Sequence, residues 1–596
     1  MNVLAAGREC VVSPGSGSGS GPGPGSGSGR SRAKNLRALL SACGCPAAAD
    51  IAEDIVVTDM TLDSRAVRPG SAFVALAGAR THGIRFAAQA AQAGARAILW
   101  EPSAAVTRPR LPAGTALIAV PDLAESLGDI ADRFFDSPSA DLRVAGITGT
   151  NGKTTTAHVL AQALAGLGES SAYAGTLGVG RMIPGPAFAG EAGGGMGKAR
   201  QMRYDYTSTT HTTPDCITVH RRLAELRNAG TRFLGMEVSS HALDQHRVAG
   251  VRFDTAVFTN LTHDHLDYHG SLAAYGAAKA RLFSWPGLKY AVINVDDEFG
   301  RSLSRRALQA QLVFYSRRDV NIPAALATNP DPRVAVFAAT AASQIRELHG
   351  DRVSAAPSGL VIDVDGSWGA HELRCGFIGD FNTENLLAVL GTLLAWGIPP
   401  AEAIAALGRC TAPPGRMEVL GAAGQVKTII DYAHTPAALE KALRAARGHC
   451  TGTLTCVFGC GGERDIGKRP LMARIAENLA DAVIVTDDNP RGEDGDAIIA
   501  DILKGFARPG QVVIERNRAA AIAGAIRGGK AGDMVLIAGK GHEDYQIIGA
   551  RRYYFSDRAV ACAALDCESG TPGSPPDGDT DGAEDGYPGE RPGVES

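Results

Sequence analysis

Long apolar runs are absent from this sequence, and none approaches the roughly 20 residues that an α-helix needs to cross a bilayer. The first residues also lack a basic segment followed by an apolar one, so we expect that the chain is not exported. Excess charge is absent too. The formal net charge is −4, which gives no reason to expect a nucleic acid or an anionic membrane as a partner. No Cys-x-x-Cys pair occurs among the 11 cysteines, so we expect reduced thiols in a cytoplasmic protein.

What is present is enough apolar material for several cores. The chain has 596 residues, of which 45% are hydrophobic, a size typical of three or four domains. Both ends differ from the rest. Residues 1–33 contain a Gly/Ser/Pro tract, and 566–596 are acidic and rich in Gly and Pro. Neither segment can bury much apolar surface, so we predict disordered tails around a folded region.

Between the tails, apolar runs alternate with helical patterns in three successive blocks, 34–140, 141–370 and 371–565. Strands are predicted at 71–78 and 95–100, at 232–240, 253–261 and 289–296, and where the segments 453–465, 481–494 and 533–544 begin. Residues 181–204 are predicted to form a surface loop. The alternation favours an α/β fold in each block, with functional residues beyond the carboxyl ends of parallel strands.

The stretch VAGITGTNGKTTTAHVL, residues 144–160, predicts a strand, a glycine-rich turn and the start of a helix. Small residues let backbone N–H groups approach phosphate oxygens, and the helix adds its positive end. Lys153 would bridge the β- and γ-phosphates, and the Thr154 hydroxyl could bind Mg²⁺. An ordinary turn before a core helix is the alternative. Ile147 stands where the usual phosphate-loop pattern has a glycine.

Two polar clusters follow predicted strands. EVSSHALDQHRV (237–248) places Glu237 at a strand end, and NLTHDHLDYHG (260–270) gathers three histidines and two aspartates. Carboxylate oxygens and a neutral imidazole near a triphosphate suit Mg²⁺. A zinc site and a simple polar loop remain open for the second cluster.

Seven motifs in order resemble those of the Mur ligases, the ATP-dependent amide-forming enzymes of peptidoglycan precursor synthesis. They are GTNGKTTT (149–156), TTP (212–214), EVSSHAL, NLTHDHLDYH, GDFNTEN (379–385), PPGRME (413–418) and DYAHTP (431–436). The resemblance covers nearly everything between the tails. It implies an α/β protein of three domains: a small UDP-binding domain, a central P-loop-like ATPase domain with a mostly parallel sheet, and a Rossmann-like C-terminal domain.

Three further motifs, MTLDSRAV (60–67), CGGERDIGKRPLM (460–472) and DDNPRGED (487–494), are similar to those of the branch that adds the third amino acid. Within it, the D-N-P-R variant accepts meso-diaminopimelate. The physics agrees, because an arginine fork pairs bidentately with the distal carboxylate of diaminopimelate, which lysine lacks. In isolation, DNPR could equally be a turn with a surface arginine.

The resemblance implies the following site residues. ATP would be held by Gly149, Thr150, Asn151, Gly152, Lys153, Thr154, Thr155, Asn385, Arg416 and Asp431. The UDP-sugar-dipeptide would contact Leu62, Ser64, Thr212, Thr213, Ser239, Gln245 and Arg247, with a loop at Ala79, Arg80 and Thr81. Diaminopimelate would contact Arg464, Asp488, Asn489, Pro490, Arg491, Gly539 and Glu543. Lys153, Lys279, His265 and Glu237 would be catalytic, with Mg²⁺ held by Thr154, Glu237, His265 and a carbamylated Lys279. From local sequence alone, Lys279 is simply a helix lysine.

The implied reaction joins meso-diaminopimelate to UDP-N-acetylmuramoyl-L-Ala-D-Glu through an acyl phosphate, in the cytoplasm and by a monomer. Three alternatives stay open: an L-lysine-adding ligase of the family, a ligase like folylpolyglutamate synthase, and a non-catalytic scaffold that senses nucleotide.

Overall fold

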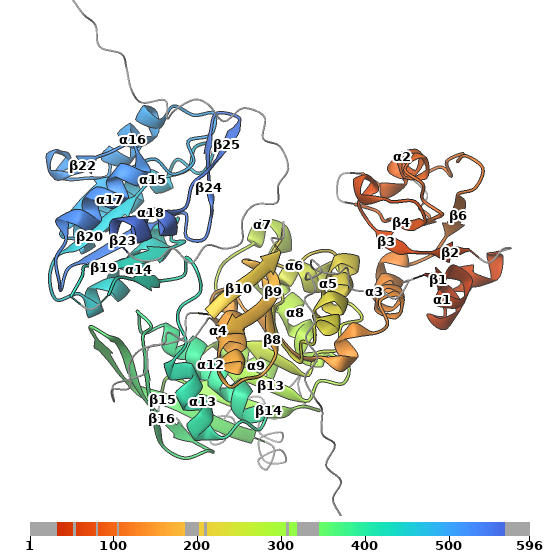
Figure 1. The fold of residues 1–596 in the computed structure, drawn as a ribbon, viewed down its shortest axis with the longest axis horizontal. Coiled ribbons are helices and arrows are strands. Elements are labelled where there is room, and N and C mark those ends of the chain that lie inside the picture. Colours follow the sequence, from red (N-terminus) through yellow and green to blue (C-terminus); the bar gives the residue numbers. More distant parts are fainter. Residues whose placement is uncertain are drawn as a thin grey trace, which may run out of the picture.

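The protein is seen here in a computed structural model that describes residues 33–51, 55–78, 81–103, 106–184, 202–207, 211–304, 309–318, 345–422 and 424–566. The two predicted tails lie outside these residues except at their inner ends. The chain forms three α/β parts, and the central part lies between the other two (Figure 1). No helix in the described part of the chain is both long and apolar enough to cross a membrane.

The N-terminal part is built on a four-stranded parallel sheet in the order β3-β4-β5-β6. All five residues of β4 are buried, as expected of a parallel strand covered on both faces. Its elements are β1 (Lys34–Asn35), α1 (Leu36–Ala42), β2 (Val56–Val57), β3 (Asp59–Thr61), η2 (Ser64–Ala66), β4 (Ser71–Ala75), η3 (Gly83–Phe86), α2 (Ala87–Gln92), β5 (Ala97–Trp100), β6 (Ala116–Ala119) and α3 (Leu123–Phe134).

The central part is built on an 11-stranded sheet in the order β10-β9-β8-β11-β7-β12-β13-β14-β15-β16-β17. Seven strands from β8 to β15 pair in parallel, and the strands at both ends are antiparallel. The parallel strands are β7 (Arg143–Thr148), β8 (Ser171–Gly175), β11 (Phe233–Glu237), β12 (Thr255–Phe258), β13 (Tyr290–Asn294), β14 (Gln311–Ser316) and β15 (Ile345–Ala356); the antiparallel ones are β9 (Gly178–Pro184), β10 (Met202–Thr207), β16 (Gly359–Gly366) and β17 (His371–Cys375).

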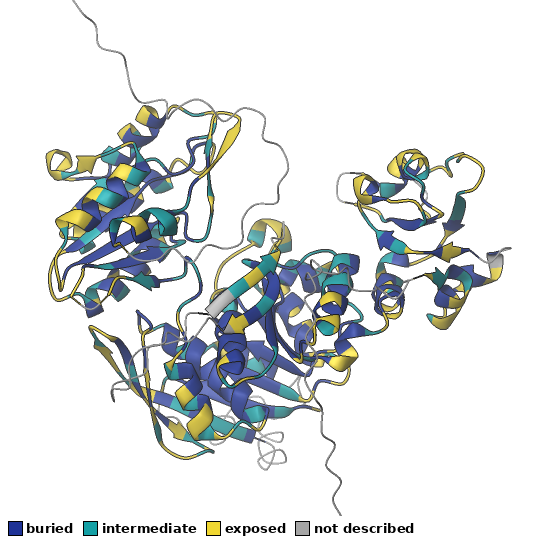
Figure 2. Ribbon diagram, in the orientation of Figure 1, coloured by how far each residue is buried: buried dark blue, intermediate teal, exposed yellow. Residues whose placement is uncertain are grey.

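Helices cover both faces of the parallel region, so β7, β8, β11, β12, β13 and β14 are almost entirely buried, whereas β15, β16 and β17 are partly exposed (Figure 2). One apolar cluster includes the buried residues of α4 and α12. Another includes those of α5 and of the segment 280–288 before β13. The helices are α4 (Lys153–Gly166), α5 (Cys216–Asn228), α6 (Ser240–Asp244), α7 (Leu266–His269), α8 (Leu272–Ala280), α9 (Glu298–Leu303), α12 (Asn382–Ala395) and α13 (Pro400–Gly408).

Two sequence predictions need correction here. The expected boundary between the second and third blocks, at 370/371, is too early. β17 is the edge strand of the central sheet, and α12 packs on α4 and β14, so the central part extends through α13. The predicted loop at 181–204 begins and ends in strands, because β9 runs to Pro184 and β10 starts at Met202; residues 185–201 lie outside the described chain.

The C-terminal part has a six-stranded sheet in the order β18-β19-β23-β20-β21-β22, parallel except for β18. This is a Rossmann-like arrangement, as predicted. Its elements are β18 (Glu418–Leu420), β19 (Lys427–Asp431), α14 (Pro436–His449), β20 (Leu454–Phe458), α15 (Lys468–Leu479), β21 (Ala482–Val485), α16 (Gly495–Leu503), β22 (Val513–Ile514), α17 (Arg518–Gly528), β23 (Met534–Ala538), β24 (Tyr545–Ile548), β25 (Arg551–Tyr554) and α18 (Asp557–Ala564).

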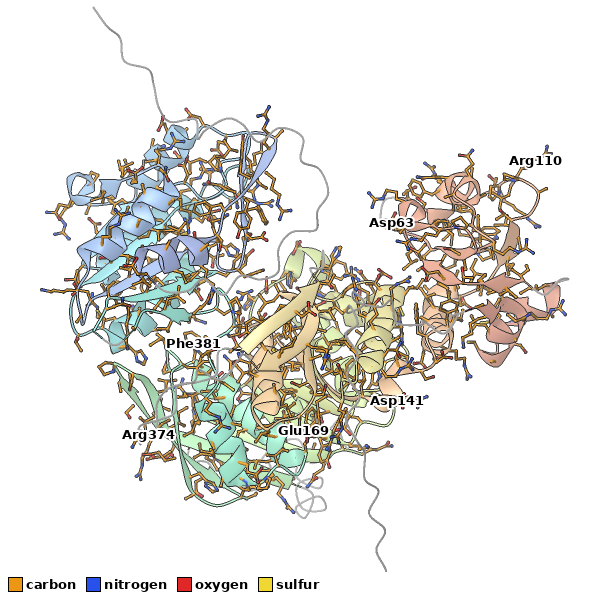
Figure 3. The ribbon with its side chains drawn as sticks, viewed as in Figure 1. Asp63, Arg110, Asp141, Glu169, Arg374 and Phe381 are labelled. Atoms are coloured by element: carbon orange, nitrogen blue, oxygen red, sulfur yellow. The ribbon has the colours of Figure 1, made fainter. Side chains whose placement is uncertain are left out.

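The central and C-terminal parts meet at α14. Phe381, just before α12, packs against the C-terminal core and marks this junction in Figure 3. His449, at the end of α14, hydrogen-bonds with Ala356 O through Nδ1 (2.7 Å) and accepts a bond from Gly379 N on Nε2 (3.2 Å). One histidine of the C-terminal part therefore contacts both the end of β15 and the loop before α12 in the central part.

Candidate active site

The loop between β7 and α4 has the geometry of a phosphate-binding turn. Gly149 and Gly152 have φ of +152° and +85°, a region that L-side chains rarely adopt. A Cβ at Gly149 would overlap Thr259 Oγ1, and one at Gly152 would overlap Asn385 Oδ1. Only glycine fits at either position, and Asn385 of α12 is held directly beside the loop.

A second loop braces this turn from the end of β12. Asn151 N donates to Asn260 Oδ1 (3.0 Å), Thr150 N donates to Asn260 O (2.8 Å), and Thr259 Oγ1 donates to Asn151 O (2.6 Å). The Lys153 ammonium donates to two loop carbonyls, Gly149 O and Thr150 O, each at 2.9 Å. Burial lowers the pKa of Lys153, and Glu237 and Asp264 oppose that shift.

Glu237 is a buried carboxylate at the end of β11 that accepts hydrogen bonds from three residues. Thr154 Oγ1 donates to its Oε2 at 3.0 Å. Thr176 donates from its backbone N to Oε1 (2.9 Å) and from its hydroxyl to Oε2 (3.2 Å), and the Tyr173 hydroxyl also donates to Oε1. The phosphate-loop threonine and a buried carboxylate are therefore in direct contact, which is an oxygen-rich setting suited to a hard divalent cation.

Lys279 is almost fully buried in the last turn of α8. Its ammonium donates to Gly149 O at 2.7 Å and lies 4.2 Å from the centre of the Tyr275 ring. Burial, and then the nearby charge of Lys153, lower the pKa of Lys279 well below its ordinary value. The structure thus brings this helix lysine against the phosphate loop.

His265 lies in a cluster of aromatic rings beside this loop. It is half exposed, its Nε2 is 3.6 Å from Asp264 Oδ2, and its ring lies edge-on to His241 with centroids 4.9 Å apart. No described contact joins His265 to Glu237 or Thr154, and no group of three His, Cys, Asp or Glu side chains within the described residues could hold a metal. Thr154 and Glu237 are the adjacent oxygen donors.

Five of the residues predicted to hold the UDP-sugar-dipeptide form one hydrogen-bonded series next to Glu237. Thr212 Oγ1 is 3.1 Å from Thr176 Oγ1, and Thr213 Oγ1 donates to Glu237 O at 3.0 Å. The series continues through Ser239, whose N donates to Thr213 Oγ1, and Arg247, which donates to Thr213 O and to Gln245 Oε1.

Leu62 and Ser64 line a pocket of about 970 Å³ between the N-terminal part and α5. Arg221 of α5 fastens this side by donating to Asp59 Oδ1 (2.7 Å) and Met60 O (2.6 Å). Thr81, predicted to join the same ligand, lines a different pocket of about 450 Å³, and Ala79 and Arg80 lie outside the described residues. The structure therefore does not unite Thr81 with Leu62 and Ser64.

Arg416 and Asp431 lie where the C-terminal part begins. The Arg416 guanidinium lies 4.8 Å from the centre of the Tyr432 ring, and Asp431 Oδ2 accepts a bond from Met417 N at 2.8 Å. Burial raises the pKa of Asp431, while Arg416 and backbone donors oppose the rise. Burial is the main cause of the lowered pKa of Lys153, and the positive charge of Arg416 adds to it.

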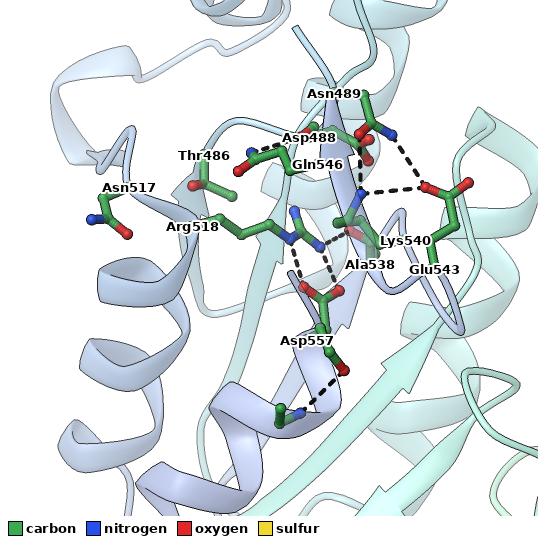
Figure 4. A network of polar contacts seen from close by, with 12 residues as sticks. Thr486, Asp488, Asn489, Asn517, Arg518, Ala538, Lys540, Glu543, Gln546 and Asp557 are labelled. Atoms are coloured by element: carbon green, nitrogen blue, oxygen red, sulfur yellow. Dashed lines mark hydrogen bonds and ion pairs between the residues drawn. The ribbon is translucent and has the colours of Figure 1, made fainter. Parts of the chain in front are cut away.

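Asp488, Asn489 and Glu543, three of the residues predicted to hold diaminopimelate, lie together at the loop after β23 (Figure 4). Asn489 Nδ2 donates to Glu543 Oε2 at 3.1 Å. Gly539 has a φ of +120°, and a Cβ there would lie 2.6 Å from Asp488 Oδ2. Burial raises the pKa of Asp488, and Arg518 and Lys540 counteract that rise.

Two arginines border this cluster. Arg491 Nη1 donates to Gly462 O at 2.8 Å, and its backbone has a φ of +56°. A Cβ at Gly461 would lie 2.9 Å from Arg491 Nη1 and 3.7 Å from Arg464 Cγ. The Arg491 guanidinium and the carbonyl of Pro490 therefore lie against the glycine pair Gly461 and Gly462, with the stem of the Arg464 side chain nearby.

Sequence reasoning missed several members of the site. Tyr173 and Thr176 hold Glu237, Asn260 and Thr259 hold the phosphate loop, and Lys540 is buried between Asn489 and Glu543. The sequence does place Lys540 inside the charged loop after a strand, which was a usable signal. Tyr173 and Thr176 carry no such signal, because their partner is more than 60 residues away along the chain.

Three family profiles match successive stretches of the chain. Residues 56–135 match the Mur ligase family, catalytic domain; 147–393 match the Mur ligase middle domain; and 415–541 match the Mur ligase, glutamate ligase domain. These limits agree with the three parts of the structure, including the later start of the C-terminal part.

Relatives extend over most of the chain. A UDP-N-acetylmuramoyl-L-alanyl-D-glutamate--2,6-diaminopimelate ligase from Xanthomonas campestris is 49% identical over 516 residues, which cover 86% of this chain and 95% of that protein. The Pseudomonas aeruginosa protein of the same name is 46% identical over 513 residues, covering 86% and 96%. A solved structure with that name is 32% identical, with a TM-score of 0.59 over 86% of this chain and 95% of its own.

Proposed function

This chain belongs to the Mur ligase family, and we propose that it joins meso-diaminopimelate to UDP-N-acetylmuramoyl-L-Ala-D-Glu at the expense of ATP. It is an ATP-dependent, amide-forming ligase of peptidoglycan precursor synthesis, like the relatives that cover most of its length. Because the reaction consumes ATP, we place it in the cytoplasm.

One observation carries the proposal. Glu237 joins the phosphate loop, through Thr154, to Thr176 and so to Thr212 of the predicted UDP-sugar-dipeptide site. Three hydrogen bonds of 3.0 to 3.2 Å span the distance between the two sets of residues. A reaction that transfers a phosphoryl group from ATP to a carboxylate needs both substrates at such close quarters.

The proposed chemistry has two steps. An oxygen of the D-Glu γ-carboxylate attacks the γ-phosphorus of ATP, and the bond to ADP breaks to give an acyl phosphate. The neutral amine of diaminopimelate then attacks the acyl carbon, and phosphate leaves as the amide forms. The Lys153 ammonium and the backbone N–H groups of the loop offset the charge that builds up on the transferred group.

Mg²⁺ would be held by Thr154 and Glu237, whose oxygens are already in contact, with His265 and carbamylated Lys279 as further proposed ligands. When bound, Mg²⁺ neutralises phosphate charge and polarises the transferred group. Tyr173 and Thr176 orient the Glu237 carboxylate by donating hydrogen bonds to it.

Carbamylation of Lys279 is supported by its burial and lowered pKa, because only the neutral amine can attack CO₂, forming an N–C bond and losing a proton. Labelled ¹³CO₂ should give a carbamate carbon signal in the unmodified protein and none in Lys279→Gln. An identical spectrum for both proteins would contradict the assignment.

The function is tested by phosphate release from the purified protein with ATP, Mg²⁺ and UDP-N-acetylmuramoyl-L-Ala-D-Glu, offered meso-diaminopimelate or L-lysine. We expect turnover with diaminopimelate and little with lysine, because lysine lacks the distal carboxylate with which Arg491 would pair. Turnover with lysine alone would keep the ligase and reject our assignment of Arg491. No turnover by folded protein would reject the proposal.

A further inference from the structure

Lys540 is a fully buried lysine that the proposed mechanism does not use. It lies in the loop Gly539–Glu543, between β23 and β24. Its neighbours Gly539 and Gly541 have φ of +120° and +54°. Both φ values are positive, which favours glycine. Lys540, between these two glycines, lies inside the C-terminal part rather than in solvent, where lysines are normally found.

The Lys540 ammonium contacts two of the residues assigned to the amino-acid substrate (Figure 4). Nζ donates to Asn489 Oδ1 at 3.2 Å and to Glu543 Oε2 at 3.3 Å. Its third neighbour is the Tyr545 ring, whose centre lies 5.3 Å away. A buried ammonium needs such partners, because its desolvation would otherwise be costly.

These bonds fix the side chain of Asn489 in one orientation. Its Oδ1 accepts from Lys540 and from Ile547 N (2.9 Å), so its Nδ2 is left to donate to Glu543 Oε2 (3.1 Å). Glu543 Oε2 in turn receives both Lys540 and Asn489. The three side chains therefore form a closed triangle in which each touches the other two.

Charge makes the triangle relevant to binding. Asp488 and Glu543 are two carboxylates in the same cluster: burial raises the pKa of Asp488, and the negative charge of Glu543 adds to that rise. A buried cation between them offsets part of this negative charge. Without Lys540, Glu543 would lose one of its two side-chain partners here and would be free to turn away from Asn489.

We propose that Lys540 is a positioning residue that holds Asn489 and Glu543 in the geometry that binds the amino-acid substrate, without touching the substrate itself. This inference rests on the proposed function. It deepens that function by naming a residue on which affinity for an amino acid bearing both ammonium and carboxylate groups depends.

The test is the KM for meso-diaminopimelate in the phosphate-release assay, at saturating ATP and UDP-N-acetylmuramoyl-L-Ala-D-Glu. Lys540→Met should raise that KM by about 10- to 100-fold, the effect expected from losing one or two hydrogen bonds to a charged group. The KM for ATP should stay within about twofold of its original value. Lys540→Arg should restore part of the loss, because it keeps the charge and the donors. Lys504→Met is the matched control, since Lys504 is exposed on the same part of the chain.

A double-mutant cycle keeps the test sharp even where Lys540→Met folds poorly. In a Glu543→Gln background, replacing Lys540 by Met or Arg should change the KM by a smaller factor than in the unmodified protein. The inference would be overturned by any of three results: the same fold-change in the KM for diaminopimelate in both backgrounds, an unchanged KM in folded Lys540→Met, or a parallel rise in the KM for ATP. Absence of turnover by the unmodified protein would overturn the proposed function and this inference with it.

Discussion

Arg491 combines a guanidinium that we propose binds diaminopimelate with a backbone conformation that suits glycine. Its φ is +56°, which costs a non-glycine residue about 1 kcal/mol. We therefore expect Arg491→Gly to be more stable than Arg491→Ala by about 1 kcal/mol, measured by urea unfolding. Both lose the guanidinium, so both should raise the KM for diaminopimelate by roughly 100-fold. Equal stability of the two variants would contradict the proposed strain.

His158 is buried in α4 against the rings of Tyr173 and Tyr204. Gln162 Nε2 donates to its Nδ1 at 2.8 Å, and burial lowers the pKa of His158 from 6.5 to about 3. The unfolded chain therefore binds a proton that the folded protein excludes, once the pH falls below about 6.5. Stability is retained above that pH and is lost below it, by about 1.4 kcal/mol per pH unit from this one group.

The measurement is the thermal-unfolding midpoint at pH 7 and pH 5. His158→Asn keeps an acceptor for Gln162 but does not titrate, so its midpoint should fall less between the two pH values than that of the unmodified protein. A control at the exposed His434, replaced by Asn, should leave the difference unchanged. Equal drops in all three proteins would show that His158 is not the group responsible.

Among single residues, the sequence predicts those candidate site residues that lie in a recognisable motif. Lys153, Glu237 and Asn489 lie in motifs after strands. In the structure Lys153 bonds to carbonyls of the phosphate loop, Glu237 to Thr154 and Asn489 to Glu543, while their roles in binding and catalysis stay predictions. The orientation of a side chain is a different matter. His265 lies in the motif NLTHDHLDYH, but its ring contacts Asp264 and His241 and has no described contact with Thr154 or Glu237. The direction of a ring depends on neighbours that other elements contribute, which a motif does not reveal.

Among the elements, the turn into α4 is the most constrained. Gly152 has a φ of +85°, and a Cβ there would overlap Asn385 Oδ1. Gly152→Ala should therefore raise the KM for ATP at least 10-fold and lower stability by roughly 1 to 3 kcal/mol. Steady-state kinetics and urea unfolding check the two effects.

The control lies at the other end of the same helix. A Cβ at Gly166 would meet nothing within 4 Å, and the residue is helical, so Gly166→Ala should stabilise the protein by about 0.5 to 1 kcal/mol and leave the KM for ATP unchanged. If both substitutions had the same effect, the strain at Gly152 would not be the cause.

Element types followed well from the sequence where an apolar run ended in a polar motif, as at β7, β11 and β23. Boundaries between parts did not. β15, β16 and β17 extend the central sheet by antiparallel pairing, and α12 packs across it onto α4. Which sheet a strand joins is decided by pairing with distant segments, so composition alone placed the boundary before β17 instead of after α13.

At the scale of the whole molecule, His449 connects two parts of the chain. It contacts Ala356 at the tip of the β15–β16 hairpin and Gly379 in the loop before α12. Burial lowers the pKa of His449, which keeps Nε2 free to accept the bond from Gly379 N. We expect His449→Phe to lose both bonds and to loosen the junction, so that calorimetry separates the unfolding of the C-terminal part from that of the central part.

Arg444→Ala is the matched control for this prediction. Arg444 lies on the exposed side of the same helix and pairs only with Glu440 among the described residues, a type of surface pair worth less than about 1 kcal/mol. Its calorimetric trace should match that of the unmodified protein. A single unchanged transition in His449→Phe would show that the junction is held elsewhere.

The loop Gly539–Glu543 has a further consequence for the molecule as a whole. Gly541 packs against Gly415, next to Arg416, and Gly539 N donates to Asp431 O at 3.1 Å, while Glu543 contacts Asn489. Residues proposed to bind ATP and residues proposed to bind diaminopimelate therefore contact the same loop. If bound ATP stiffens this loop, it raises the affinity of the protein for diaminopimelate by a factor α. Diaminopimelate must then raise the affinity for ATP by the same factor α. Binding isotherms for each ligand, measured with and without the other, should then give the same value of α. That value measures the coupling carried by the loop Gly539–Glu543.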